Sequence, residues 1–288
     1  MDFQSSSPTQ KPSDFAQGFS LSKAESRIFF QLAERGTRFF TVKDVESLET
    51  GISRKEVNGL LSKLEKKGRV RRIERGKYLF SPPQSGLDGS WAEHEFAVAD
   101  FIAPKPYYLS YYSALFHWKA TDQIPRTVFV VTNRQKKPVV FNGVTYKFIC
   151  KKTTPIRMPI TSSWTTATFS GRNVNIATKE QALLDCLEHP EYCGGVVEAA
   201  RLLQPRMGLV WQVIEREITR AKSAVQRRLA YLMDLTGTRN ELWWKLDNQR
   251  FVGYRLLDPS RSKQGTYSKK YGLQLNVDKQ ELVFEALQ

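Results

Sequence analysis

Residues 53–68 carry the pattern that most narrows the folds open to this chain. Ser53 and Glu56 stand three residues apart, as in a capping box, where each side chain bonds to the other residue's backbone N–H. Apolar residues then recur at helical spacing: Val57, Leu60, Leu61 and Leu64. Gly68 is suited to end the helix because glycine tolerates a left-handed backbone. The segment therefore predicts a helix with one buried stripe and one polar face.

Two shorter helices are predicted before it. Ser22 and Glu25 form another capping box, and Gly36 marks the end of that helix. Thr41 begins the second helix, and a short turn containing Gly51 leads into the third. A helix, a short turn and a helix make a helix-turn-helix.

A basic hairpin is predicted directly after the third helix. Residues 69–73 and 77–80 alternate in strand fashion and flank a turn at Arg75-Gly76. Three helices followed by such a hairpin predict a winged helix-turn-helix over residues 20–81. Residues 1–19 are expected to be a disordered tail and residues 82–90 a linker.

The positive charge of the chain is concentrated in this module. The whole chain has 44 Lys and Arg against 29 Asp and Glu, a net charge of +15. Residues 51–80 hold ten basic and three acidic residues, whereas residues 1–50 hold six basic and seven acidic ones. Double-stranded DNA is therefore the expected partner, since phosphate attracts such a surface.

Twelve residues are expected at the DNA. Arg54 suits guanine and Asn58 suits adenine as bidentate partners near the start of the recognition helix. The other cations on this helix and on the hairpin are expected to contact phosphates. The start of the second helix is expected to bind a further phosphate. The full set is Thr41, Lys43, Ser53, Arg54, Lys55, Asn58, Ser62, Lys63, Lys66, Arg72, Arg75 and Lys77. A winged helix used for protein contact, or for RNA, stays an alternative.

Residues 91–288 are expected to form a larger domain, a small sheet packed by helices, so that the whole chain is α+β. Asn142-Gly143 between two apolar runs is a strong hairpin signal, and Thr178 is suited to begin a helix. Ser223 and Gln226 suggest a further capping box. The segment after residue 246 is only weakly patterned.

This larger region shows little catalytic chemistry. It has no glycine-rich phosphate loop, no GxSxG motif and no paired carboxylates in a nuclease-like pattern, so we expect no enzyme and no cofactor. Cys186, His189 and Cys193 are spaced suggestively for a metal but lack a fourth ligand nearby, and a helix end explains them equally well. No metal is therefore expected.

Two basic runs in this region either contact phosphate or only balance acidic neighbours. They are Arg134/Lys136/Lys137 and Arg216/Arg220/Lys222/Arg227/Arg228. The chain has three cysteines and neither a signal-peptide pattern nor a long apolar segment, which predicts a cytoplasmic protein with no membrane contact.

Several motifs in order resemble the AbiEi antitoxin family of transcriptional regulators. They are residues 75–78, 107–115, 121–125, 128–138, 142–148 and 177–185. The resemblance implies a repressor of its own operon that binds inverted repeats. The oligomeric state stays open, with monomers that bind the repeats cooperatively as one arrangement. The resemblance further implies the antitoxin of a type IV toxin–antitoxin pair, which counters a nucleotidyltransferase-like toxin without forming a stable complex.

Three other functions stay open beside this one. The first is a nucleic-acid-processing enzyme that uses the winged helix for targeting. The second is a stand-alone transcriptional regulator with no toxin partner. The third is a nucleoid or RNA-binding adaptor without an operator.

Overall fold

The computed structural model describes residues 20–48, 52–82, 93–151 and 163–287. The chain divides into an N-terminal unit, Met1–Glu93, and a C-terminal unit, His94–Gln288. The predicted tail 1–19 and residues 83–90 of the predicted linker lie outside the described residues. Helices and separate sheets occur in both units, so the predicted α+β class is confirmed.

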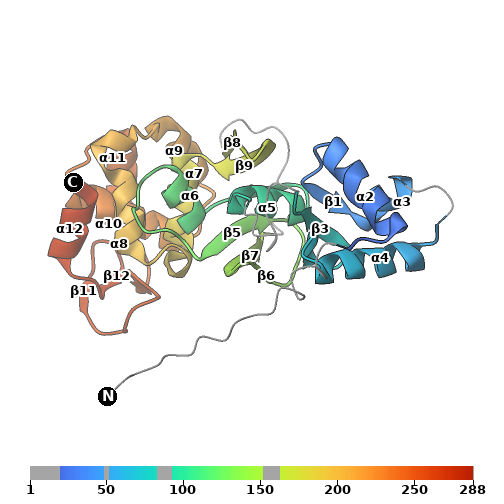
Figure 1. Cartoon of the computed structure of the whole chain (residues 1–288). Helices are drawn as coiled ribbons and strands as arrows, with labels where there is room; N and C mark the ends of the chain where they lie inside the picture. The colour runs from blue at the N-terminus through green and yellow to red at the C-terminus, as the bar shows by residue number, and fades with distance from the viewer. Residues whose placement is uncertain (1–19, 49–51, 83–92, 152–162, 288) are drawn as a thin grey trace, which may run out of the picture. The chain divides into compact units, whose positions relative to one another are not determined.

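The N-terminal unit packs three helices against a three-stranded antiparallel sheet (Figure 1). Its elements in order are α2 (Lys23–Glu34), β1 (Phe39–Thr41), α3 (Val42–Leu48), α4 (Arg54–Lys66), β2 (Val70–Glu74) and β3 (Lys77–Phe80). The strand order is β1-β3-β2. This arrangement fits the predicted winged helix-turn-helix, with β1 as a strand that the sequence analysis missed.

The core of this unit follows from the predicted apolar stripes. Ile28 and Leu32 of α2 pack with Val57, Leu61 and Leu64 of α4 in one buried cluster. Both predicted capping boxes are formed, at Ser22–Glu25 and at Ser53–Glu56. The caps fix where α2 and α4 begin, and the stripes decide which face of each helix is buried.

The C-terminal unit contains a six-stranded mixed sheet with strand order β6-β7-β5-β4-β9-β8. The strands are β4 (Tyr107–Leu109), β5 (Thr127–Thr132), β6 (Val139–Phe141), β7 (Val144–Cys150), β8 (Trp164–Phe169) and β9 (Arg172–Ala177). Val128 to Thr132 of β5 are all buried, which shows that both faces of the sheet are covered. The covering helices include α5 (Glu95–Ile102), α6 (Tyr112–His117) and α7 (Lys179–Glu188).

Two local predictions in this unit are confirmed and one is wrong. Asn142 and Gly143 have φ angles of 50° and 74° and join β6 to β7, as the Asn-Gly hairpin signal indicates. Thr178 caps α7 by accepting a hydrogen bond from the Gln181 N–H. Ser223 does not cap a helix; it is the first residue of α10, and its hydroxyl accepts a hydrogen bond from Arg227.

The rest of the C-terminal unit is helical, with one small sheet. The helices are α8 (Val196–Ala200), α9 (Trp211–Ile218), α10 (Ser223–Leu235), α11 (Glu241–Asp247) and α12 (Lys279–Leu287), with short 3-10 turns at Pro190–Tyr192, Arg201–Leu203 and Pro205–Met207. The sheet has strand order β10-β12-β11, with β10 (Arg255–Leu256), β11 (Thr266–Ser268) and β12 (Leu273–Leu275). The weakly patterned end of the sequence is thus ordered.

Two buried arginines of α10 hold this segment in place. Arg227 donates hydrogen bonds to the carbonyls of Val252, Gly253 and Gly272, at 2.6–2.8 Å. Arg228 donates to the carbonyls of Leu187 and Leu256. Both side chains are nearly inaccessible to solvent. Arg227 and Arg228, two members of the basic run at residues 216–228, therefore do not contact phosphate, because their guanidinium groups donate hydrogen bonds to carbonyls inside the protein.

Asp258 provides a second link between the segment after residue 246 and the helices, through a hydrogen bond to α8. Its carboxylate accepts a hydrogen bond from the Val196 N–H at the start of α8 and another from the Ser260 hydroxyl. Gly195 has a φ of 105°, and a Cβ there would lie 2.6 Å from an Asp258 oxygen. The close approach requires glycine at this position.

A buried ion-pair network joins β7 to α7. The Lys151 ammonium lies 2.8 Å from Asp185 and 2.7 Å from Glu188, and Lys222 lies 2.9 Å from the other Glu188 oxygen. Burial raises the pKa of Glu188, but the two lysines outweigh it and bring the pKa to about 2.

Acid titration tests this network. Because the folded pKa of Glu188 lies below its ordinary value of 4.5, its stabilisation is complete above that pH and is lost as the pH falls toward 2. We expect Glu188→Gln to lower stability at neutral pH by up to about 3 kcal/mol and to bring it nearer to wild type at pH 2. Urea unfolding followed by tryptophan fluorescence measures both. The control is Glu241→Gln, an exposed residue with no ion pair among the described residues. A Glu188→Gln deficit that is the same at every pH contradicts the assignment.

Candidate nucleic-acid interface

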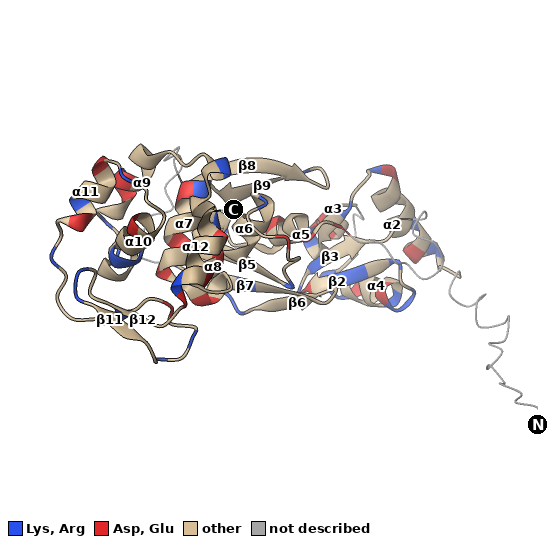
Figure 2. Ribbon diagram, turned by 90° about the vertical axis from the view of Figure 1, so that its left-hand side faces the viewer, with Lys and Arg blue, Asp and Glu red and all other residues tan. Residues whose placement is uncertain are grey.

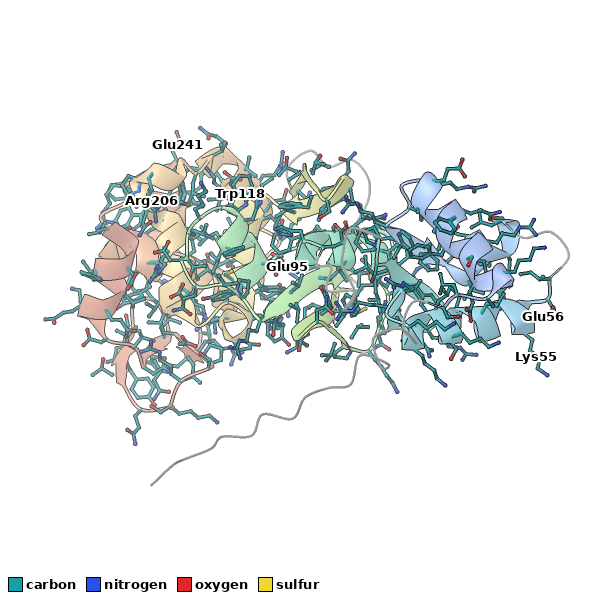
Figure 3. The ribbon with its side chains drawn as sticks, in the orientation of Figure 1. Lys55, Glu56, Glu95, Trp118, Arg206 and Glu241 are labelled. Carbon is teal, nitrogen blue, oxygen red and sulfur yellow. The ribbon has the colours of Figure 1, made fainter. Side chains whose placement is uncertain are left out.

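The exposed face of α4 is set by the side that it buries. Val57, Leu61 and Leu64 face the core. At roughly 100° per residue, Lys55 and Lys66 lie nearly opposite this stripe. Figure 3 shows Lys55 extending outward from the first turn of the helix. The outward face of α4 is therefore basic, as predicted.

Most of the predicted cations are exposed and unpaired. Six of them make no ion pair with any described residue: Lys43, Lys55, Lys63, Lys66, Arg72 and Arg75. β2 packs against α4, and Figure 2 shows Lys and Arg positions on both elements. We call these six side chains, five on α4 and the hairpin together with Lys43 on α3, the α4–hairpin surface. Exposed positive charge without internal partners is available to an anionic ligand.

Arg54 has an internal partner that the sequence analysis missed. Its Nε lies 3.7 Å from a Glu46 carboxylate oxygen on α3, and its side chain is 66% exposed. That Glu46 oxygen is buried without a hydrogen bond. Arg54 and Asn58 lie on the flank of α4 rather than at the centre of its outward face. The ion pair joins a residue of α3 to a residue of α4, so no spacing within one helix signals it.

Thr41 and Ser53 act as helix caps. The Ser53 hydroxyl donates to Glu56 at 2.7 Å, and the Thr41 hydroxyl donates to Asp44 at 2.9 Å. The Ser53 hydroxyl and backbone N–H hold the pKa of Glu56 below its ordinary value, so this carboxylate stays charged. Each helix start therefore presents a carboxylate beside the hydroxyl, which opposes binding of a phosphate there. Ser62 and Asn58 are exposed.

The hairpin places its basic residues at a tight two-residue turn. Gly76 has a φ of 76°, which lets Arg75-Gly76 join β2 to β3 directly. Lys77 pairs with Glu74 at 3.1 Å and is half-buried. Lys67, on the other hand, is drawn inward, since its ammonium lies 2.6 Å from buried Glu25. The hairpin cations that face solvent are thus Arg72 and Arg75.

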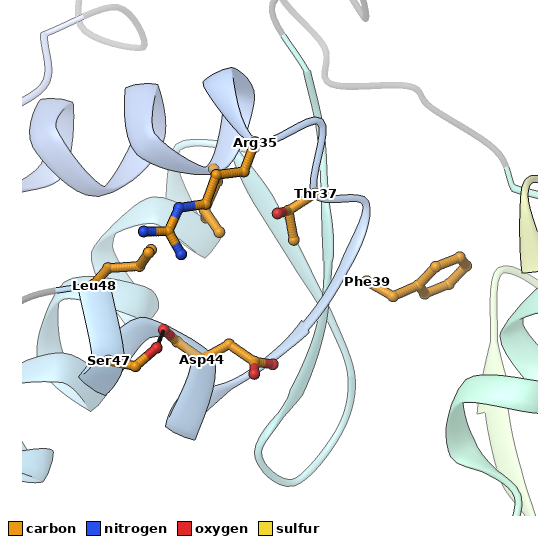
Figure 4. Close-up of a pocket in the computed structure, with 7 residues that line it drawn as sticks. Arg35, Thr37, Phe39, Asp44, Ser47 and Leu48 are labelled. Atoms are coloured by element: carbon orange, nitrogen blue, oxygen red, sulfur yellow. Dashed lines mark hydrogen bonds between the residues drawn. The ribbon is translucent and has the colours of Figure 1, made fainter.

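A shallow hollow lies elsewhere on the N-terminal unit. It measures about 280 Å³ and is lined by Leu32, Arg35, Thr37, Phe39, Asp44, Ser47 and Leu48 (Figure 4). The Ser47 hydroxyl donates to the Asp44 carbonyl at 2.6 Å. None of the described lining side chains is a buried polar group without a hydrogen bond. The hollow therefore shows no sign of a specific ligand.

Several of the other sequence candidates in the C-terminal unit make contacts within the protein. Lys136 donates to the Ile102 carbonyl at 2.6 Å. Cys186 and Cys193 are buried, and the Cys193 thiol donates to the Pro190 carbonyl. His189 lies 2.9 Å from Glu191 and stacks on Tyr192. Within the described parts of the chain, no three His, Cys, Asp or Glu side chains are placed to hold a metal ion. Among the helices of the described residues, none has the length and apolarity to cross a membrane.

A solved structure shares the fold. The crystal structure of the RV2827C protein from Mycobacterium tuberculosis aligns with a TM-score of 0.63, covering 88% of this chain and 92% of that one. The two sequences are 14% identical, so the match concerns the fold alone. No curated protein matches the sequence.

A family match bears on the first unit. Residues 27–81 match the model described as "Transcriptional regulator, AbiEi antitoxin". The further motifs at residues 107–185 lie outside that match. A family of transcriptional regulators implies DNA binding. The α4–hairpin surface therefore lies in a segment, residues 27–81, that is similar to the AbiEi antitoxin family of transcriptional regulators, which confirms the resemblance seen in the sequence.

Proposed function

We propose that this chain is a transcriptional regulator that binds double-stranded DNA through the α4–hairpin surface. The observation that carries the proposal is the set of six exposed cations that no described carboxylate neutralises. In a helix-turn-helix the second helix of the motif enters the major groove, and α4 has that place in the chain. The family match over residues 27–81 supports the same function.

The residues of α4 are assigned either to phosphate contacts or to base contacts according to their place along the helix. Lys63 and Lys66, in the second half of the helix, are assigned to phosphates, and Arg72 and Arg75 to the adjacent backbone or minor groove. Lys55, Arg54 and Asn58 lie in the first half, which meets base edges in this motif. The proposed contact set is completed by Lys43, Ser62 and Lys77. Thr41 and Ser53 contribute as helix caps that orient α3 and α4, and they do not bind phosphate directly.

The regulator is proposed to repress its own operon by binding inverted repeats upstream, one chain on each repeat. It is further proposed as the antitoxin of a type IV pair, countering a nucleotidyltransferase-like toxin without a stable complex. The antitoxin role rests on the family description alone.

The first test is the salt dependence of binding to the DNA upstream of the gene. Lys55→Ala with Lys63→Ala removes two outward cations, so affinity falls for all duplexes and the slope of log K against log salt decreases by about 0.9 for each phosphate that is no longer neutralised. Fluorescence anisotropy at several salt concentrations measures both. Lys279→Ala, at an exposed site on α12, serves as the control. An unchanged slope in the double variant contradicts the phosphate assignment.

The second test concerns Arg54. Arg54→Ala is expected to cost about 1–3 kcal/mol on the operator and much less on random DNA. Glu46→Gln frees the guanidinium from its ion pair and is expected to tighten operator binding, but only when Arg54 is present. A double-mutant cycle on both DNAs checks this. Equal losses on operator and random DNA would falsify base reading by Arg54.

The third test addresses the antitoxin role. The chain is co-expressed with the toxin candidate encoded beside it, and growth and co-purification are recorded. We expect growth to be restored with no co-purified toxin, and the Lys55/Lys63 double variant to restore it equally well. Failure to restore growth, or a stable complex, contradicts the type IV proposal, and the DNA-binding proposal stands or fails separately.

A further inference from the structure

The segment 250–270 carries a second concentration of positive charge. It holds six basic residues against one acidic residue, Asp258. Asp258 is fully buried and caps α8, so it offers little to the surface. Figure 2 shows Lys and Arg positions on the loops around β11 and β12. This region lies outside the family match and outside the α4–hairpin surface.

Four of the six cations have no ionic partner among the described residues. Arg261 pairs with Glu281 through two contacts of 2.6 and 2.8 Å, and Lys270 pairs with Asp247 at 2.6 Å. The others are exposed and make no ion pair with a described residue: Arg250, Arg255, Lys263 and Lys269. Their positive charge is therefore available to a ligand.

Two tyrosine rings lie together on one face of the small sheet, whereas Arg255 pairs with buried Leu273 and lies on the other face. Tyr267 pairs with Gln274, and Gln274 pairs with Leu256, so the three residues share a face. Tyr254 precedes Leu256 by two residues, and its ring centroid lies 4.9 Å from that of Tyr267, at 69°. The rings are 43% and 60% exposed. Neither ring belongs to the core.

A neighbouring tyrosine, Tyr271, differs from this pair because its ring is buried and packs against a helix. Tyr271 is 4% exposed and packs edge-to-face against Tyr231 on α10, with centroids 5.7 Å apart. Leu273 is fully buried on the opposite face from Tyr267. The packing needs of the sheet are thus met by other residues, and the Tyr254–Tyr267 pair is left for solvent or for a partner.

The chemistry of this face fits single-stranded nucleic acid. Proteins bind unpaired strands with cations that follow the phosphates and with aromatic rings on which bases stack. Sheets that present aromatic residues are a recurring platform for such strands. In a duplex the base faces are covered by their neighbours, so the rings would add nothing there. The combination of rings and unpaired cations distinguishes this face from the α4–hairpin surface, which presents no aromatic residue among those assigned to DNA.

We propose that the outward face of the β10-β12-β11 sheet binds single-stranded nucleic acid, with bases stacked on Tyr254 and Tyr267 and phosphates at Arg250, Lys263 and Lys269. The two rings provide binding that tolerates any base, because every base has a π face. The three cations make the binding dependent on salt.

The experiment uses the full chain with fluorescent oligo(dT) and oligo(U), and a duplex of random sequence for comparison. Tyr254→Ala with Tyr267→Ala is expected to weaken single-strand binding about tenfold or more, since each stacked base contributes roughly 1–3 kcal/mol. Tyr254→Phe with Tyr267→Phe keeps both rings and is expected to bind within about twofold of wild type. Lys263→Ala with Lys269→Ala should reduce the salt slope by about 0.7 for each phosphate that is no longer neutralised.

Two controls separate this surface from other effects. Phe284→Ala removes an aromatic ring that is 60% exposed on α12, outside the sheet, and is expected to change nothing. Lys55→Ala with Lys63→Ala should weaken duplex binding and leave single-strand binding intact, so the two proposals fail independently. Thermal unfolding confirms that each variant is folded.

The outcomes are decisive in either direction. Tighter binding of oligo(U) or of oligo(dT) assigns the strand as RNA or DNA, and both support the proposal. The proposal is overturned if the full chain binds neither oligonucleotide. It is also overturned if the tyrosine-to-alanine variant binds both as wild type does, because the face would then be only a basic surface.

Discussion

A cation cannot leave water without partners, and this constraint determines where each part of the structure can act. Arg227 and Arg228 can be buried because backbone carbonyls accept their hydrogen bonds, and Lys151 can be mostly withdrawn from water because Asp185 and Glu188 compensate its charge. The cations of the α4–hairpin surface have no such partners among the described residues and stay in water. The Lys and Arg side chains behind the net charge of +15 therefore include some that hold the protein together and others that stay exposed without an ionic partner among the described residues.

The buried cations explain how the end of the chain is ordered. The carbonyls of Val252, Gly253 and Leu256 accept hydrogen bonds from the two guanidinium groups, and the Gly272 carbonyl accepts one from Arg227 as well as one from the Arg255 N–H. Asp258 provides the reverse arrangement, an acceptor for the first N–H of α8. These hydrogen bonds are made without Tyr254 and Tyr267, which are 43% and 60% exposed.

Local patterns in the sequence predicted local structure well. The Ser22 and Ser53 caps, the stripe of α4 and the Asn142-Gly143 hairpin depend on neighbouring residues, and all are confirmed. Long-range contacts were not predictable in the same way. The pairing of β4 with β9, the Arg54–Glu46 ion pair and the burial of Arg227 join residues that the sequence separates. An exposed arginine and a buried one look alike in a charge count, so the basic run at 216–228 was open to misassignment as a phosphate contact.

The same distinction bears on what each surface can recognise. On α4 the cations are spaced along a rigid helix whose caps fix its start, so a ligand must match that spacing, as the grooves and phosphates of a duplex do. On the small sheet the cations lie mostly on loops around two rings, which suits a flexible strand that can adjust its phosphates while its bases stack. On these two proposals, charge attracts nucleic acid to both surfaces, whereas the rigidity of one and the aromatic rings of the other determine which form is bound.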